Sequence, residues 1–336
     1  MLSAAVVAAA SAQRALALGA NTNTSIFSPA STPSHAIYSL SLFVLAITGG
    51  IFVVVGGLIL YAAVRFRQRR DDDGSEPPQI FGSNQIELSW TIIPVLIVVV
   101  LFLATARMIF AIQDAPRPTA ALEVTVIGHQ YWWEFRYPEL HITTANELHI
   151  PVSPAEAPRP TYMKLTSADV MHSFWVPRLA GKVDVIPNRI NDLWMDPHTP
   201  GLYVGQCAQF CGVEHAKMLL RVYVDTPEQF AAWVKGQQQP GVQDPAVAAG
   251  RHEFESQACM NCHTVGGTAA HGQFGPDLTH LASRKTLAAG ATDNTTQGLE
   301  KWIDDPDLIK PGSLMPSMHL TPDQVREITA YLNTLQ

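Results

Sequence analysis

Two long apolar runs dominate the N-terminal part of the chain. Ala36–Val64 and Trp90–Ala111 are hydrophobic almost throughout, and each exceeds the ~20 residues that a helix needs to cross a bilayer. Buried helices of soluble proteins seldom run so long without a polar face. The pattern therefore predicts a two-helix transmembrane hairpin over residues 36–113, with the lipid bilayer as a partner.

The loop between the two predicted helices is rich in arginine. Arg65, Arg67, Arg69 and Arg70 follow the first apolar run directly. A local excess of Arg and Lys marks the cytoplasmic side of a membrane helix. Both ends of the chain are therefore expected on the periplasmic or outer face of a bacterial inner membrane.

The N-terminal segment, residues 1–35, has two parts of different character. Its Ala-rich start ends near Leu18-Gly19-Ala20, small residues of the kind found at signal-peptide cleavage sites, but Met1-Leu2-Ser3 carries no positive side chain. Residues 21–34 are polar and are expected to be exposed. Cleavage of a signal peptide stays an open question.

After residue 114 the spacing of apolar positions changes to the period of two that is typical of strands. Leu122–Gly128 alternates apolar and polar residues, and Leu219–Val224 does so more loosely, with prolines and glycines between the two. Residues 114–236 are therefore predicted to form an all-β, Greek-key sandwich.

The last part of the chain, residues 237–336, is predicted to be a linker followed by an all-α domain. Gly236–Gly241 is rich in Gln, which indicates a linker, and Asp244-Pro245 is expected to begin the first helix. Thr321–Gln324 is a capping box with proline at the first helical position, and it predicts a helix to Leu335.

Composition agrees with a multidomain membrane protein. The chain has 336 residues, of which 47% are hydrophobic and only 15% charged, with a formal net charge of −7. This length suits two or three domains. No basic stripe is present, so nucleic acid is not an expected partner.

Two of the 4 cysteines stand in a haem-attachment pattern. Cys259, Cys262 and His263 form C-x-x-C-H, in which two thiols bond the haem vinyl groups and the histidine coordinates the iron. A chance occurrence of this short pattern is the alternative. The sequence therefore predicts covalently attached haem c.

The other two cysteines lie among imidazole and thioether side chains. A mononuclear blue-copper site needs one Cys, two His and a weak axial Met, so a second thiolate in the same loop indicates a second copper. We predict a dinuclear, mixed-valence centre suited to one-electron transfer. Its predicted ligands are His172, Cys207, Gln209 through its main-chain carbonyl, Cys211, His215 and Met218.

A structural zinc site and a disulfide are the alternatives for these cysteines. Zinc accepts two Cys and two His, but it gives Met218 no role. A disulfide gives the histidines none, so copper is favoured.

The copper motif resembles a known family. Ser167–Phe174 and Cys207–Met218 together are similar to the CuA domain of cytochrome c oxidase subunit II, at the spacing that this family uses. The resemblance implies a cupredoxin-like fold. Glu87–Pro94 also resembles this family, in which the Glu lies near the cytoplasmic mouth of a proton path into subunit I. Glu87 is therefore a proton-path candidate, and its alternative role is that of an acid at a helix N-terminus.

The C-terminal part resembles class I cytochromes c. Gly275–Leu278 is similar to the loop in which a proline carbonyl, here that of Pro276, holds the proximal His ring. Trp302 and Arg284 fall where that family places donors to a haem propionate.

The distal haem ligand is predicted from the same resemblance. Pro311–Pro316 is similar to the loop that carries the axial thioether, and Met315 has the family spacing. Met318 is the alternative and is expected to pack or to lie on the surface. His/Met ligation raises the haem potential.

Two positions depart from the subunit II pattern. The family usually has an exposed Trp near copper, where electrons arrive from cytochrome c, directly after Gly-His-Gln; here that residue is Tyr131, which leaves the role open between Tyr131 and Trp132. The family often has a Glu between the cysteines whose carboxylate binds magnesium at the subunit I interface. Gln209 is a poorer ligand for a hard cation, so magnesium is not predicted, although Asp169 and water remain an alternative.

The resemblance covers residues 36–336 and implies subunit II of a proton-pumping terminal cytochrome c oxidase with a fused cytochrome c domain, the caa type. Electrons would pass from a cytochrome c through the chain's own haem and dicopper centre to subunit I, which reduces oxygen. The first alternative is the electron-input subunit of a CuA-containing nitric oxide reductase. Nitrous oxide reductase lacks the helix hairpin, quinol oxidases lack the copper ligands, and a copper carrier would have to release its metal.

Overall fold

The computed structural model describes residues 24–67, 74, 76, 79, 81–113, 121–154, 156–241 and 244–336. They fall into two compact units. One contains the residues up to Ser34 together with those after Pro118, and the other is His35–Arg117. The predicted cleavage region and the predicted cytoplasmic residues Arg69 and Arg70 lie outside the described residues.

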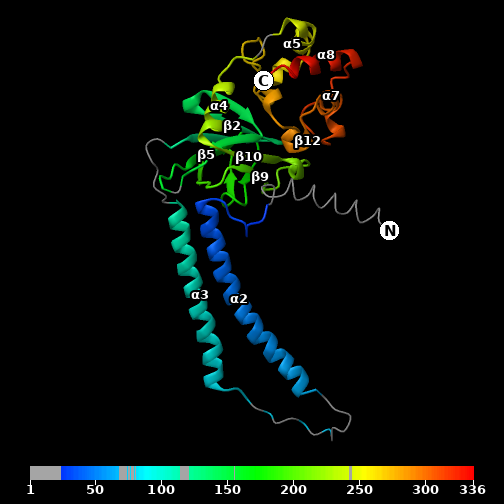
Figure 1. Ribbon diagram of the computed structural model, residues 1–336. Coiled ribbons are helices and arrows are strands. Elements are labelled where there is room, and N and C mark those ends of the chain that lie inside the picture. The colour runs from blue at the N-terminus through cyan, green and yellow to red at the C-terminus, as the bar shows by residue number, and fades with distance from the viewer. Residues whose placement is uncertain are drawn as a thin grey trace, which may run out of the picture. The chain divides into compact units, whose positions relative to one another are not determined.

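The smaller unit contains two long apolar helices, α2 (Thr32–Arg65) and α3 (Asn84–Gln113) (Figure 1). The most apolar 18-residue stretches of the two helices have mean hydropathies of 2.6 and 2.7, and both helices are long and apolar enough to cross a membrane. Each begins earlier and ends slightly later than the apolar run that predicted it. Glu87 lies in the first turn of α3, where an acid interacts favourably with the helix dipole.

Two five-stranded sheets form the β part of the larger unit. The first has the order β3-β2-β1-β5-β8, and the second has the order β4-β10-β9-β6-β7. β1 pairs in parallel with β5, and β10 with β4, so the chain crosses between the sheets as in a cupredoxin-like sandwich. The first sheet consists of β1 (Glu123–His129), β2 (Trp132–Tyr137), β3 (Ile142–Ala145), β5 (Thr161–Ser167) and β8 (Asn191–Met195). The second consists of β4 (Glu147–Pro151), β6 (His172–Trp175), β7 (Val183–Val185), β9 (Gly201–Cys207) and β10 (Leu219–Asp225).

The alternation seen in the sequence explains how the sheets pack. Along β1, β5 and β10 every second residue is buried, as the pleat of a strand requires. The buried side chains of both sheets form one core. Trp133 and Phe135 are fully buried there, and both rings pack edge-on against Phe174.

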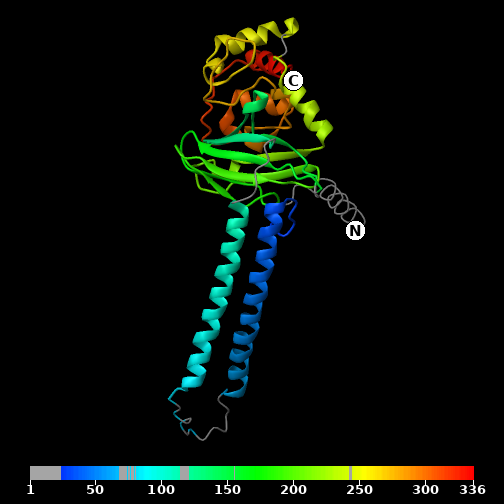
Figure 2. The same ribbon diagram turned by 90° about the vertical axis from the view of Figure 1, so that its left-hand side faces the viewer.

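Helix α4 (Pro227–Gln237) follows β10, the last strand of the two sheets, and opens with a capping box formed by Thr226 and Gln229. The thiol-bearing C-terminal part then contains α5 (Ala248–Ser256), α6 (Cys259–Cys262), α7 (Thr296–Asp304) and α8 (Pro322–Leu332). Its core joins α5 to α8, where Phe254 packs against Tyr331. Figure 2 shows these helices, in yellow to red, against the green sheets.

Three local predictions for this part are corrected. The last helix ends at Leu332 rather than Leu335, because Asn333 is its C-cap. Asp244 caps a single 3-10 turn, Pro245–Val247, before α5 begins. The part is also not purely helical, because Thr286–Leu287 and Thr292–Asp293 pair as short strands β11 and β12. The fold class as a whole agrees with the prediction, while the domain boundaries remain predictions.

Candidate copper and haem sites

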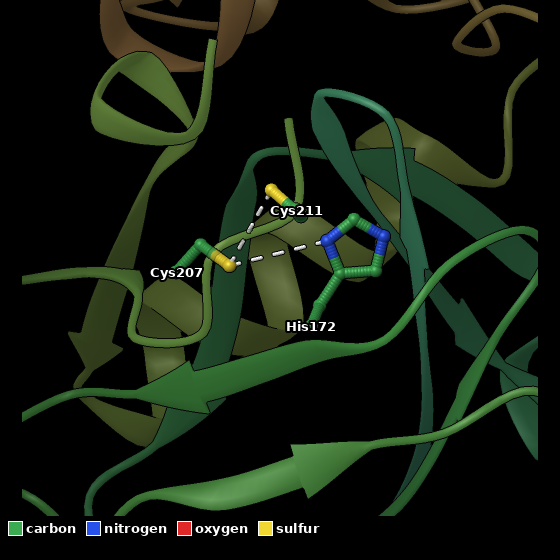
Figure 3. A group of neighbouring side chains, drawn as sticks. All are labelled: His172, Cys207 and Cys211. Atoms are coloured by element: carbon green, nitrogen blue, oxygen red, sulfur yellow. Dashed lines mark hydrogen bonds between the residues drawn. The ribbon is translucent and has the colours of Figure 1, made fainter. Parts of the chain in front are cut away.

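The predicted copper ligands come together at one end of the sandwich. Cys207 ends β9, and the loop from there to β10 carries Cys211, His215 and Met218, while His172 begins β6. His172, Cys207 and Cys211 are buried, and their ligand atoms lie within 4.8 Å of one another (Figure 3). Both thiols are free.

Each predicted ligand atom has a neighbour at a distance that a shared metal would bridge. The two sulfur atoms are 3.9 Å apart. The Nδ1 atom of His172 lies 3.9 Å from the Cys207 sulfur, and that of His215 lies 3.7 Å from the Cys211 sulfur. The Met218 sulfur is 3.8 Å from the Cys211 sulfur, and the Gln209 carbonyl oxygen is 3.1 Å from the Cys207 sulfur. The arrangement gives one imidazole to each end of a thiolate pair.

The two thiols share a hydrogen bond. The contact with the Cys211 sulfur lowers the pKa of Cys207 to about 3. The same contact raises the pKa of Cys211. The lowered pKa of Cys207 favours its thiolate, which is the form that binds soft metals.

Asp169 orients the imidazole of His172. Its Oδ1 atom lies 2.8 Å from His172 Nε2, and its Oδ2 atom accepts a hydrogen bond of 2.5 Å from the Gln130 amide. Burial disfavours the charged ring, but the hydrogen bonds to Asp169 and Cys207 outweigh it and raise the pKa of His172. Because Nε2 is held in this way, Nδ1 faces the sulfur atoms.

A cavity in the C-terminal part brings the predicted haem residues together. Its lining includes Cys259, Cys262 and His263, and opposite them Met315 and Met318. Both methionines are half-buried. Met318, which was expected to pack elsewhere or to be exposed, therefore lines the same cavity, and the choice of axial ligand remains a prediction.

The proximal side of this cavity is shaped around His263. The ring Nδ1 lies 2.8 Å from the Pro276 carbonyl oxygen, which leaves Nε2 as the nitrogen able to coordinate a metal. A Cβ atom at Gly275 would lie 2.5 Å from His263 Cε1, so only glycine fits there. Burial lowers the pKa of His263 and keeps the ring neutral, which is the ligating form.

Arg284 provides an unsatisfied donor at the cavity wall. One terminal nitrogen donates to the Asp277 carbonyl oxygen, at 2.5 Å, but Nε is buried and has no partner among the described residues. A buried donor without a partner is costly, and an acidic group of a ligand in the cavity would satisfy it. Trp302, on α7, lines the same cavity. Both observations fit the predicted donors to a haem propionate.

Tyr131 and Trp132 are placed differently from the exposed aromatic residue of the family pattern. Only 8% and 9% of their surfaces are exposed, and both line the cavity of the C-terminal part. The Tyr131 hydroxyl also lies against Gly212, inside the copper-ligand loop. The two side chains therefore stand between the two candidate sites.

Three charged residues that the sequence did not single out lie beside these sites: Glu147, Lys217 and Lys310. Their side chains are bonded to main-chain groups across the boundary between the β part and the C-terminal part. Charged residues are usually solvated, so nothing in the local sequence marks them.

Three family models match the chain. They are described as the transmembrane domain of cytochrome c oxidase subunit II, over residues 20–108, the periplasmic domain of the same subunit, over residues 143–224, and cytochrome c, over residues 247–336. Together they reproduce the predicted order of hairpin, sandwich and haem domain.

Curated relatives match along nearly the whole chain. Cytochrome c oxidase subunit 2 of Alkalihalophilus pseudofirmus is 31% identical over 94% of this chain and 91% of its own length, and that of a Bacillus species is 33% identical over 93% and 91%. Quinol oxidase subunit 2 of Bacillus subtilis is 34% identical, but over only 65% of this chain and 68% of its own.

The matches to both subunit II models, to the cytochrome c model and to the full-length relatives point to a single assignment. The chain is anchored in a membrane and carries a periplasmic domain. It belongs to the cytochrome c oxidase subunit II family, as the electron-input subunit of a haem-copper terminal oxidase, which is an oxidoreductase complex.

Proposed function

We propose that the chain relays electrons from a cytochrome c, through its own covalently attached haem c and a dinuclear CuA centre, to subunit I of a proton-pumping oxidase that reduces oxygen. One observation carries this proposal. Five side chains and one main-chain carbonyl of the predicted copper motif converge at one place, His172 from the start of β6 and the others from the end of β9 and the loop that follows it, with an imidazole at each end of the thiolate pair.

The donor set fits copper better than zinc. Two thiolates and two imidazoles satisfy either metal, but the buried Met218 thioether lies against Cys211, and a thioether is a soft ligand that suits copper. When bound, the copper pair and the haem supply one-electron transfer. Strands β9 and β10 flank the copper-ligand loop, and Asp169 fixes the His172 ring.

The C-terminal part would hold its haem by the residues already described. Cys259 and Cys262 would attach it, His263 would coordinate the iron, and Arg284 would donate to a propionate. Pro276 keeps the proximal ring in place. An apolar cavity excludes water from the haem faces, which together with the axial ligands sets the redox potential.

Purifying the chain with its oxidase partners tests the proposal. We expect two copper ions per chain with one unpaired electron shared between them, and oxygen consumption driven by reduced cytochrome c. Zinc in place of copper, or a single copper with a localised spin, would refute it. Consumption of nitric oxide in place of oxygen would favour the reductase alternative, and turnover driven by quinol alone would favour a quinol oxidase.

Location in the bacterial inner membrane is part of the same proposal. Arg65, at the end of α2, and Arg67, just after it, support a cytoplasmic loop between the helices. The copper and haem parts would then face the periplasm, which the family model's periplasmic domain supports.

Replacing Asp169 with Asn is expected to weaken copper binding by about 10- to 100-fold, the range for groups that orient metal ligands. The amide cannot act as the charged acceptor that now holds His172 Nε2. Copper retention against a chelator measures the effect. Asp192→Asn, which removes an exposed carboxylate on β8, is the matched control and should retain copper normally. Equal retention by both variants would show that Asp169 does not position the ligand.

Replacing Glu87 with Ala tests the proton-path proposal. If Glu87 lies on that path, turnover and proton uptake should both fall, while the copper and haem spectra stay unchanged. Gln85→Ala, in the same helical turn, is the control. Turnover and proton uptake that match those of the unaltered enzyme would leave Glu87 with only its role at the helix N-terminus.

A further inference from the structure

The boundary between the β part and the C-terminal part encloses charged side chains that neither candidate site uses. Glu147, on β4, and Lys310, which precedes Pro311–Pro316, are each only 3% exposed. Lys and Glu are almost never buried to this extent unless they are paired. Most of the groups that hydrogen-bond to these two side chains lie in the other part of the chain.

Lys310 reaches from the C-terminal part into the β part. Its ammonium donates to the carbonyl oxygens of Tyr131 at 2.7 Å, Lys217 at 2.9 Å and Ala288 at 3.2 Å. An ammonium has three donors, so these contacts satisfy it completely. Burial lowers the pKa of Lys310 to about 8, which leaves the side chain charged at neutral pH.

Lys217 makes the reverse contact. Its ammonium donates to the Ile309 carbonyl oxygen at 2.9 Å, while its own carbonyl accepts from Lys310. Lys217 immediately precedes Met218 in the copper-ligand loop, and Ile309 and Lys310 lead into the loop that carries Met315. Two reciprocal hydrogen bonds therefore join the copper-ligand loop to the loop of the distal haem ligand.

A close contact lies beside this pair. A Cβ atom at Gly312 would come 2.6 Å from Val213 Cγ2, and Gly312 has a φ of +85°, so glycine is required on both counts. The two loops therefore also lie against each other at Gly312 and Val213.

Glu147 makes a second connection between the two parts, through residues far in the sequence from the lysine pair. Its carboxylate accepts from the Thr286 amide at 2.8 Å, the Thr286 hydroxyl at 2.7 Å and the Lys285 amide at 3.0 Å. All three donors belong to the C-terminal part. Hydrogen bonds to a charged acceptor are roughly twice as strong as neutral ones.

Tyr131 and Trp132 lie inside the area that these contacts surround. Trp132 packs with Ala145 and Ala289, and so joins both parts in one small apolar cluster. The Tyr131 carbonyl accepts a hydrogen bond from Lys310, and the Tyr131 ring contacts the copper-ligand loop at Gly212.

We propose that Lys310, Lys217 and Glu147 are positioning residues that fix the haem part in one docked arrangement on the copper part. The inference rests on the proposed function and adds a consequence to it. Because Tyr131 and Trp132 are covered in this arrangement, an external donor delivers electrons only to the haem part, and the copper loop receives them from within the chain.

The first test measures electron transfer inside the intact oxidase. After rapid reduction of the haem, the rate of copper reduction in Lys310→Met should fall at least about tenfold, because the change removes a charged group bonded to three carbonyls. Reduction of the haem by a small-molecule reductant, the copper spin signal and the haem spectrum should stay unchanged. Lys301→Met, which removes an exposed charge on α7, is the control. An internal rate in Lys310→Met equal to that of the control would overturn the proposal.

The second test does not depend on bound cofactors. Glu147→Gln should speed hydrogen exchange at the Lys285 and Thr286 amides by about tenfold or more, because their charged acceptor is lost. Glu139→Gln, on the exposed turn after β2, should leave both amides protected. Thr286→Val, which removes only the hydroxyl donor, gives a milder variant if Glu147→Gln folds poorly. Unchanged protection in both test variants would refute the docked arrangement, whereas absence of copper or haem from the unaltered protein would count only against the proposed function.

Discussion

Replacing Cys211 with Ser is expected to abolish the two-copper centre and to lower oxygen consumption more than 100-fold, beyond the roughly 10- to 100-fold range for groups that merely orient ligands. The Cys211 sulfur lies within 3.9 Å of three other predicted ligand atoms, those of Cys207, His215 and Met218. A serine oxygen is a hard ligand that binds copper poorly beside a thioether. Metal content, the copper spin signal and cytochrome c-driven oxygen consumption measure the effect.

The fold should survive this change, since Ser is close to Cys in size and the surrounding strands supply the core. Ala208→Ser, one residue after Cys207 in the same loop, adds a hydroxyl without removing a sulfur and should keep both coppers. Haem attachment at Cys259 and Cys262 should be normal in both variants. A Cys211→Ser protein that still shares one unpaired electron between two coppers would contradict the bridging role.

The copper motif could be predicted from sequence because its chemistry is local. Cys207, Cys211, His215 and Met218 lie within one loop, so their spacing alone restricts the geometry. His172 was assigned to the same site although it lies 35 residues before Cys207, and the structure brings its Nδ1 atom to that place. The long apolar helices and the capping boxes were predictable for the same reason, since each depends on residues that are neighbours in the chain.

Contacts between distant segments could not be predicted in this way. Glu147 and Thr286 are 139 residues apart, and Lys310 and Tyr131 are 179 apart. Each of these side chains would be assigned to a solvated surface on sequence alone. The burial of Tyr131 and Trp132 depends on the same docking, which is why the exposed aromatic residue of the family pattern was a poor guide to their positions.

Replacing Met315 with Ala is expected to remove the thioether ligand of the haem, because Met315 has the family spacing after Pro311 and lines the haem cavity. The haem potential should then fall by on the order of 0.1 V or more, within the roughly 0.8 V that axial ligands span. The charge-transfer band of thioether-ligated ferric haem should disappear. The driving force for electron transfer from the haem to the copper centre should rise, and the haem should be held less stably.

Met318→Ala is the matched comparison, since Met318 lines the same cavity and is equally half-buried. It should leave the band and the potential close to those of the unaltered protein, because only packing is lost. The reverse pattern, with the band lost in Met318→Ala and kept in Met315→Ala, would assign the iron ligand to Met318. Lys310 holds the start of this loop against the copper part. If Met318 were the ligand, the iron would therefore be bound by a residue further along the chain from this contact than Met315.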